Sequence, residues 1–221
     1  NKVLSGCDVK NSPEGDLLVN SPKVFLCYRA LPETYRIIMG QALVEAAQGM
    51  AMYQKRKRDD PRLVFQLKDE EDLEQYCYYV AGVVGKMLTR FFCLESSLVP
   101  LTATLEKYQI PFGLCLQLTN IAKDYPKDLK RGWCYIPETM TRRFGIKAED
   151  LLETPYLKRQ EIIETLINET LPHLESAFQY ILALPPREIS IRMFCLIPFT
   201  LAYYTLLHLK TTGESKINRA Q

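Results

Sequence analysis

Apolar residues recur at helical spacing along most of the chain. After an acidic stretch at 69–72, the apolar positions Leu73, Tyr76, Val80, Val84, Met87 and Phe91 lie on one face of a helix that ends near residue 93. Similar patterns predict helices over 32–57, 102–125, 158–184 and 189–209, with a kink before Pro111 and an interruption at Pro172. No stretch alternates with the period of two that indicates a strand. The expected fold class is therefore all-α.

Turn-forming residues set the expected boundaries. Glycine, asparagine and proline are frequent in residues 1–22, which predicts a loop or mobile segment there. Residues 23–221 are expected to form one domain, because a single core can grow to about 250 residues before a chain divides. Pro126 predicts that the preceding helix ends at Tyr125. Gly132 and Pro137 predict a loop over 131–143 that enters a short helix.

The charge of the chain is nearly balanced. The formal net charge is +2, from 28 basic and 26 acidic residues, so no overall field attracts nucleic acid and we expect no such partner. The basic run at 55–58 is followed directly by Asp59 and Asp60, which favours a solvated helix end over a phosphate site. With 47% apolar residues, the composition is that of a globular protein with a sizeable core.

The cysteines and apolar stretches indicate the redox compartment of the chain and whether it has a membrane-spanning segment. The seven cysteines are widely spaced and odd in number, which indicates neither a disulfide framework nor a C-x-x-C metal site and favours a reducing compartment. No signal-peptide pattern is visible at the start of the chain. Residues 189–209 are largely apolar, but Arg192, Pro198 and several hydroxyl-bearing side chains interrupt them, so we expect a buried core helix and not a membrane span.

Asp124 and Asp128 are the clearest candidates for chemistry. Their spacing of four places both carboxylates on one helix face, about 6 Å apart. Magnesium takes one or two carboxylates and completes its octahedron with water and phosphate oxygens, so this pair suits a diphosphate-bridging site. A solvated acidic pair is the alternative from spacing alone. The two histidines, His173 and His208, are far apart, which disfavours triads and histidine-rich metal sites.

The residues around this pair carry a family resemblance. The stretch Gly113-Leu-Cys-Leu-Gln117-Leu-Thr-Asn120-Ile-Ala-Lys123-Asp124, followed by Asp128 and by Lys130-Arg131-Gly132-Trp-Cys-Tyr135-Ile-Pro137, resembles the second aspartate-rich signature of squalene and phytoene synthases. Gln117, Asn120, Asp124 and Asp128 form one helical stripe. The resemblance implies that the aspartates bind magnesium and that Gln117, Asn120 and Lys123 contact the substrate. Lys123 stands where the family usually has arginine, which keeps the charge but loses the bidentate donor.

A second stretch, Tyr76-Cys-Tyr-Tyr-Val80-Ala81-Gly-Val-Val84-Gly, resembles the tyrosine-centred helix of squalene synthases in particular. The resemblance implies that Tyr76 steers carbocation and proton chemistry, and that Val80, Ala81, Val84 and Leu88 line a prenyl channel. Apolar walls suit that role, because a carbocation must be kept from water and an isoprenoid tail must be buried. A core helix with small residues for close packing is the alternative.

Two further matches lie near the end of the chain. Met193-Phe194-Cys195-Leu-Ile-Pro198 is similar to the family's Phe-Cys-x-x-Pro helix, which implies that the Phe194 ring faces the reaction and stabilises a carbocation. A packed aromatic side chain is the equal alternative. Lys216 and Arg219 occupy the place of a basic segment that binds the nicotinamide cofactor, although surface charge is their default interpretation.

The resemblance predicts an isoprenoid-synthase-type helical bundle around a central prenyl cavity. It implies a transferase that joins two farnesyl diphosphates through presqualene diphosphate and reduces the product to squalene, with Mg²⁺ and NADPH as cofactors. A phytoene or dehydrosqualene synthase without NADPH, and a non-catalytic assembly or scaffold protein, are the alternatives. We expect a monomer in the cytoplasm, peripherally associated with a membrane surface; in a eukaryote this would be the endoplasmic reticulum, with any anchor outside this chain.

One family feature is missing from these residues. The family carries two aspartate-rich motifs, and the only D-x-x-x-D in the sequence is Asp124/Asp128. Residues 23–221 are therefore expected to be the C-terminal major part of a single prenyl-synthase domain, and this chain alone is expected to be inactive.

Overall fold

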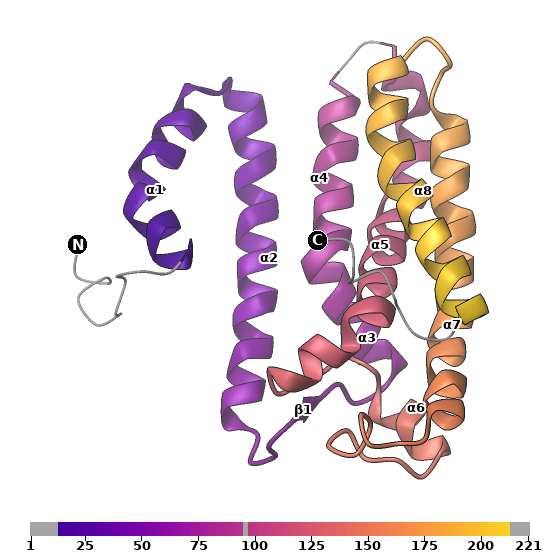
Figure 1. Cartoon of the computed structure of the whole chain (residues 1–221). Helices are drawn as coiled ribbons and strands as arrows, with labels where there is room; N and C mark the ends of the chain where they lie inside the picture. Colours follow the sequence, from indigo (N-terminus) through magenta and orange to yellow (C-terminus); the bar gives the residue numbers. More distant parts are fainter. Residues whose placement is uncertain (1–12, 95–96, 213–221) are drawn as a thin grey trace. The chain divides into compact units, whose positions relative to one another are not determined.

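The described part of the chain is almost entirely helical. The computed structural model describes residues 13–94 and 97–212 (Figure 1). Its α-helices are α1 (Pro13–Ala30), α2 (Glu33–Asp59), α3 (Glu70–Cys77), α4 (Val83–Phe92), α5 (Thr102–Lys130), α6 (Glu138–Arg143), α7 (Tyr156–Ala183) and α8 (Ile189–Thr212). A π-helix, η1 (Tyr78–Gly82), joins α3 to α4, and a 3₁₀ turn, η2 (Val99–Leu101), leads into α5. The two-residue strands are β1 (Phe65–Gln66) and β2 (Trp133–Cys134). The predicted all-α class is confirmed.

The chain forms two compact units, Asn1–Gln41 and Ala42–Gln221. Within the first, the Tyr28 hydroxyl donates to the Arg36 carbonyl at 2.8 Å and ties α1 to the start of α2. The predicted loop over 1–22 is wrong for residues 13–22, which begin α1; residues 1–12 lie outside the described ones. Its turn-forming residues mislead because Pro13 occupies the first turn, where no backbone N–H is needed.

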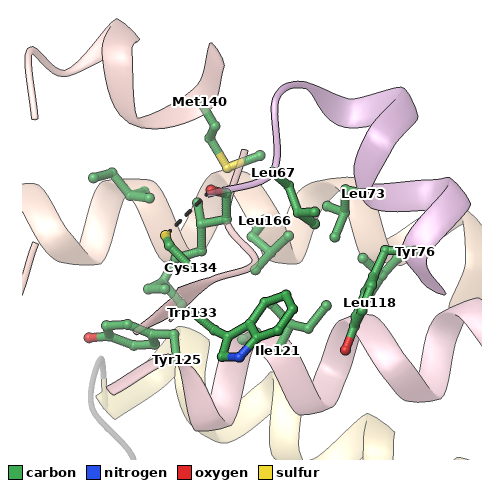
Figure 2. Close-up of a cluster of buried hydrophobic side chains, with 14 of the residues drawn as sticks. Leu67, Leu73, Tyr76, Leu118, Ile121, Tyr125, Trp133, Cys134, Met140 and Leu166 are labelled. Atoms are coloured by element: carbon green, nitrogen blue, oxygen red, sulfur yellow. Dashed lines mark hydrogen bonds between the residues drawn. The ribbon is translucent and has the colours of Figure 1, made fainter. Parts of the chain in front are cut away.

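Helix α5 is the central element of the second unit and packs against α4, α7 and α8. Its apolar face contributes Leu118, Ile121 and Tyr125 to the buried cluster drawn in Figure 2. The other labelled members are Leu73 and Tyr76 from α3, Leu166 from α7, and Leu67, Trp133, Cys134 and Met140 from the segments beside them. Each leucine, isoleucine or methionine among them contributes about 1.5–3 kcal/mol on burial. This core fixes the rotation of α5 and therefore the direction of its polar stripe.

The prolines inside helices do not end them. Helix α5 continues through Pro111 and Pro126 to Lys130, so the predicted end at Tyr125 is wrong. A proline removes one backbone hydrogen bond, but Tyr125 and Leu129 are both buried on the same face and hold the last turns in place. Helix α7 likewise passes Pro172 without the predicted interruption. As a result, Asp124 and Asp128 lie on one continuous helix.

The predicted helix over 69–93 is divided by a π turn. Asp69 caps its start by accepting a hydrogen bond from the Asp72 N–H. At η1 the Val83 N–H bonds to the Tyr78 carbonyl, five residues back, before α4 resumes the normal pattern. A π turn inserts one extra residue and rotates the side chains that follow it, and such turns occur frequently at functional sites.

Two distant segments pair just beyond the end of α5. Strands β1 and β2 are parallel, with Phe65 opposite Trp133 and Gln66 opposite Cys134. Gly132 precedes β2 at φ +73, a left-handed conformation that favours glycine. This pairing was not predicted, because a two-residue strand shows no periodicity. The predicted short helix after it is α6.

Helix α8 is not the buried core helix that its composition predicts. Cys195, Ala202, Leu206 and Leu209 are buried, but the other face is exposed and carries Ile189, Met193, Phe194, Leu196, Ile197, Leu201, Tyr203, Tyr204 and Leu207. Because α8 is apolar on every side, its sequence does not identify the face that packs. Residues Ile189–Thr211 are long and apolar enough to span a membrane, judged by length and composition alone.

Candidate functional site

The polar stripe of α5 lines a pocket. Gln117, Asn120, Asp124 and Asp128 surround a space of about 450 Å³ together with Tyr76 of α3. Ile121, Lys127, Arg131 and Tyr135 complete its lining, and we call this space the polar pocket. The structure therefore brings together five of the residues that the sequence singles out. Lys123 lies beside them, with its Nζ 3.2 Å from Asp124 Oδ2.

The charges in the polar pocket are of both signs. Asp124 Oδ1 is 3.2 Å from Lys127 Nζ, so this carboxylate is paired with lysines on both sides. The pKa of Asp128 is raised, chiefly by burial and then by the negative charge of Asp124, while Arg131 and Lys127 act in the opposite direction. An additional cation in the pocket would relieve the repulsion between the two carboxylates.

The donor set fits a magnesium ion shared with a substrate. Among residues 13–94 and 97–212, no group of three or more histidine, cysteine or carboxylate side chains forms a closed metal cage. Asp124 and Asp128 instead supply two carboxylates beside an open space. That is the arrangement in which magnesium keeps several coordination positions for water and phosphate oxygens.

Tyr76 is held rigidly at the edge of the pocket. Its side chain is buried, and its ring stacks on Tyr135 with centroids 4.5 Å apart and meets the Tyr53 ring edge-on at 5.2 Å. Burial is the main cause of its raised pKa, followed by the hydrogen bond to the Tyr135 hydroxyl. Tyr76 therefore keeps its proton at neutral pH.

A second space, the apolar cavity, lies between α5, α8 and the η1–α4 segment. It has a volume of about 350 Å³ and is lined by Val80, Ala81, Val84, Gly85, Leu88, Thr89, Phe92, Gln109, Phe112, Gly113, Leu116, Tyr180, Phe194, Cys195 and Pro198. The four predicted channel residues and Phe194 are all among them. Phe194 meets the Phe92 ring edge-on, with centroids 5.9 Å apart.

Glycines set the distance between the helices that bound the apolar cavity. A methyl group on Gly113 would lie 2.4 Å from the Ala81 carbonyl oxygen, and one on Gly85 would lie 2.1 Å from the Gln109 carbonyl oxygen. The backbones can approach this closely only without a Cβ atom. Gly113 and Gln117 are four residues apart on one face of α5, and Val80 in η1 follows Tyr76 by four residues, so the polar pocket and the apolar cavity lie next to each other.

Several lining residues were not assigned a role from the sequence. Arg131 and Tyr135 lie within the resembling stretch, so that match contained the signal for them. The Thr89 and Tyr180 hydroxyls lie 2.8 Å apart and are 91 residues apart in the chain, which leaves no local pattern to detect. Lys216 and Arg219 lie outside the described residues, so their predicted role has no structural counterpart here.

The basic run at 55–58 is only partly a solvated helix end. Arg56 forms a bidentate ion pair with Asp72, with both N–O distances 2.6 Å. Lys57 donates to the Arg131 carbonyl at 2.8 Å. Lys55 and Arg58 are exposed. The solvated prediction is therefore wrong for two of the four residues, because α3 and the segment after α5 fold back onto this end of α2.

Comparison with known proteins gives a consistent result. Residues 4–221 match the model of the squalene/phytoene synthase family. Squalene synthase of Rattus norvegicus is 28% identical over 211 residues, which cover 93% of this chain and 48% of the rat protein. Squalene synthase of Schizosaccharomyces pombe is 31% identical over 199 residues, covering 89% and 42%. The chain thus spans just under half the length of these relatives.

Solved structures agree in fold. A ligand complex of TcSQS superposes with a TM-score of 0.75 at 25% identity, covering 87% of this chain and 54% of that one. Squalene synthase HpnC from Alicyclobacillus acidocaldarius gives 0.55 at 17% identity, covering 90% and 65%, which supports the fold alone. The predicted isoprenoid-synthase helical fold is confirmed. With a family match over almost all of its length, the chain belongs to the squalene/phytoene synthase family.

Proposed function

We propose that the protein is a prenyl transferase that condenses two farnesyl diphosphates head to head through presqualene diphosphate and reduces the product to squalene. One observation carries the proposal: a polar pocket with paired aspartates lies directly beside an apolar cavity. An allylic diphosphate has the same two-part character, with a charged head and a long hydrocarbon tail. The squalene synthases that resemble this chain support the choice of substrate.

The polar pocket would receive the diphosphate. Arg131 and Lys127 line it and offer donors to phosphate oxygens, and Lys123 lies beside Asp124 at its edge. Asp124 and Asp128 would hold magnesium, which when bound neutralises the leaving diphosphate. Gln117 and Asn120 extend the same helical stripe and would orient the substrate by hydrogen bonds.

Tyr76 would act as a proton donor near the departing diphosphate. Its raised pKa disfavours the phenolate, so it can donate a hydrogen bond or a proton but is a poor base at neutral pH. The stacked Tyr135 ring and the edge-on Tyr53 ring together hold the Tyr76 ring in one orientation. Fixed orientation matters because a donor stabilises developing charge best when it need not reorganise.

The apolar cavity would hold a prenyl tail and exclude water from the carbocation. Its walls are aliphatic and aromatic side chains from η1, α4, α5 and α8. Phe194 is about half exposed and lines the cavity, so its ring can face a cationic carbon. Exclusion of water protects the intermediate until it rearranges.

The reduction by NADPH rests on the family resemblance and on Lys216 and Arg219 in the tail. We further propose that the protein works at a membrane surface on its cytoplasmic side, because the product would be a hydrocarbon and α8 presents an exposed apolar face. The family's first aspartate-rich motif is absent from these 221 residues, so we expect activity only from a protein that carries both motifs and none from this chain alone.

The test is to incubate the complete protein with farnesyl diphosphate and Mg²⁺, with and without NADPH, and to identify the hydrocarbon. We expect squalene with NADPH, and no squalene when NADPH is omitted. A product unchanged by omitting NADPH would indicate a dehydrosqualene synthase. No product from the complete protein, or a normal yield after Asp124→Ala, would overturn the catalytic proposal and favour a scaffold role.

A further inference from the structure

Lys57 makes contacts that its place in a basic run does not suggest. It lies in the last turns of α2, and its Nζ donates to the Arg131 carbonyl at 2.8 Å. The same Nζ lies 4.5 Å from the centroid of the Trp133 ring, a cation–π distance. Burial lowers the pKa of Lys57, which is consistent with a side chain turned towards the protein.

The carbonyl that Lys57 binds belongs to a turn directly after Asp128. The Arg131 N–H bonds to the Asp128 carbonyl at 2.9 Å and closes α5, and Gly132 then reverses the chain at φ +73. The Gly132 carbonyl accepts from the Phe65 N–H at 3.1 Å. The Lys57 ammonium also lies near the C-terminal end of α5, where the negative end of the helix dipole stabilises a cation. Lys57 therefore holds the exit of the helix that carries both aspartates.

Trp133 connects Lys57 to the polar pocket. Its ring stacks on Tyr135, with centroids 5.4 Å apart and planes 20° from parallel. Tyr135 in turn stacks on Tyr76 at 4.5 Å and 23°. Tyr76, Tyr135 and Arg131 all line the polar pocket. The order Lys57, Trp133, Tyr135, Tyr76 is thus a continuous line of contacts from the end of α2 to the candidate proton donor.

We propose that Lys57 is a positioning residue for the polar pocket: it fixes the segment 131–135 so that Arg131 and the Tyr135–Tyr76 pair face a bound diphosphate. The inference rests on the proposed function, since it concerns the same site. Lys57 does not line the pocket and acts only through the residues that do.

The test measures binding of inorganic pyrophosphate with Mg²⁺ by calorimetry, together with the emission of Trp133, the single tryptophan in these 221 residues. The variants are Lys57→Met, which removes the cation, and Lys57→Gln, which can still donate to the Arg131 carbonyl. Lys55→Met is the matched control, because Lys55 lies on the same helix and is exposed. Thermal unfolding of each variant is recorded alongside.

We expect Lys57→Met to weaken pyrophosphate binding roughly tenfold, which is typical when a residue that orients a ligand-binding group is removed. Its Trp133 emission should shift, Lys57→Gln should lie between it and the wild type, and Lys55→Met should match the wild type. A melting temperature close to that of Lys55→Met separates this effect from general destabilisation. If Lys57→Met does not fold, the comparison of Lys57→Gln with Lys55→Met decides.

Wild-type affinity and emission in both Lys57 variants would overturn the inference, and so would an equal loss in Lys55→Met. Failure of the proposed function looks different. In that case the wild type itself binds no pyrophosphate, while the shift in Trp133 emission still reports whether Lys57 holds the segment.

Discussion

The polar pocket and the apolar cavity share α5 but are built in different ways. The polar pocket gathers charged and aromatic side chains from α3, α5 and the segment after α5, and many of them pair with each other. The apolar cavity depends on what is missing, because Gly85 and Gly113 lack the Cβ atoms that would separate its walls. Chemistry is concentrated in one part, and the shape of the site is set in the other.

The electrostatic states of the two parts also differ. In the polar pocket, partial burial and the nearby charge of Asp124 raise the pKa of Asp128, so the ionised form of Asp128 costs stability. The apolar cavity contains one comparable cost: within the described structure, Gln109 Oε1 is buried without a hydrogen-bond partner. Removing a charge from the polar pocket should therefore lower activity while raising stability, whereas adding bulk to the walls of the apolar cavity should lower stability.

The largest effect is expected from Asp128→Asn. Loss of one carboxylate should lower product formation by at least about 100-fold. The magnesium ion would lose a ligand, and the charge of the leaving diphosphate would be less well neutralised. Stability should rise instead, by about 0.5 kcal/mol, since the half-buried charge beside Asp124 is removed. Product analysis and urea unfolding at pH 7 measure the two effects, with Glu71→Gln on the exposed side of α3 as the control.

The stability gain of Asp128→Asn should depend on pH in a defined direction. The folded protein disfavours the ionised form of Asp128, so its cost is present above the raised pKa and is relieved as the pH falls through it. The gain should therefore shrink as the pH is lowered from 7 towards the ordinary carboxyl value of 3.8. A gain that grows on acidification would contradict this account.

Gly113→Ala should push apart α5 and η1, two walls of the apolar cavity, where their backbones lie closest together. The added methyl group would lie 2.4 Å from the Ala81 carbonyl oxygen and 2.9 Å from the Gly82 nitrogen, and backbone atoms cannot move aside cheaply. We expect a net loss of about 2 kcal/mol in unfolding free energy, despite the higher helix propensity of alanine. Ala103→Val adds bulk to an exposed position of α5 and should change stability little. Equal stability of Gly113→Ala and wild type would show that the helices can separate.

Phe194→Leu tests whether the cavity stabilises charge or only encloses a tail. Loss of the ring should lower kcat roughly tenfold through the lost cation–π attraction. Because Phe194 is 55% exposed, its removal should affect stability only slightly. Tyr204→Leu, also on α8 and 63% exposed, is the control. A Phe194→Leu enzyme with unchanged kcat would assign the ring to packing.

Gln109→Met should have the smallest effect. It replaces a buried, unpaired acceptor with an apolar side chain of similar length, which should raise the unfolding free energy by about 1 kcal/mol. Gln48→Met on the exposed side of α2 should leave stability unchanged. Destabilisation by Gln109→Met in urea unfolding would mean that Gln109 makes a favourable contact in the protein.

Much of the candidate site could be predicted because its residues lie on local helical patterns. The stripe from Gln117 to Asp128 follows from spacing alone, and the resemblance adds Tyr76 and Phe194 from other helices. Spacing could not place the end of α5, since Pro126 predicts a stop that the buried Leu129 overrides. It also could not predict the π turn at η1, which depends on how that segment packs against α5.

The sequence by itself determined the helical class, the acidic pair and the family, because these depend on composition and on residues near each other in the chain. Only the tertiary structure decided which residues support them. Lys57 reaches the Arg131 carbonyl across 74 residues, and Thr89 meets Tyr180 across 91. The exposed face of α8 was likewise undecided by its sequence, since a helix that is apolar on all sides shows its buried face only when neighbouring helices pack against it.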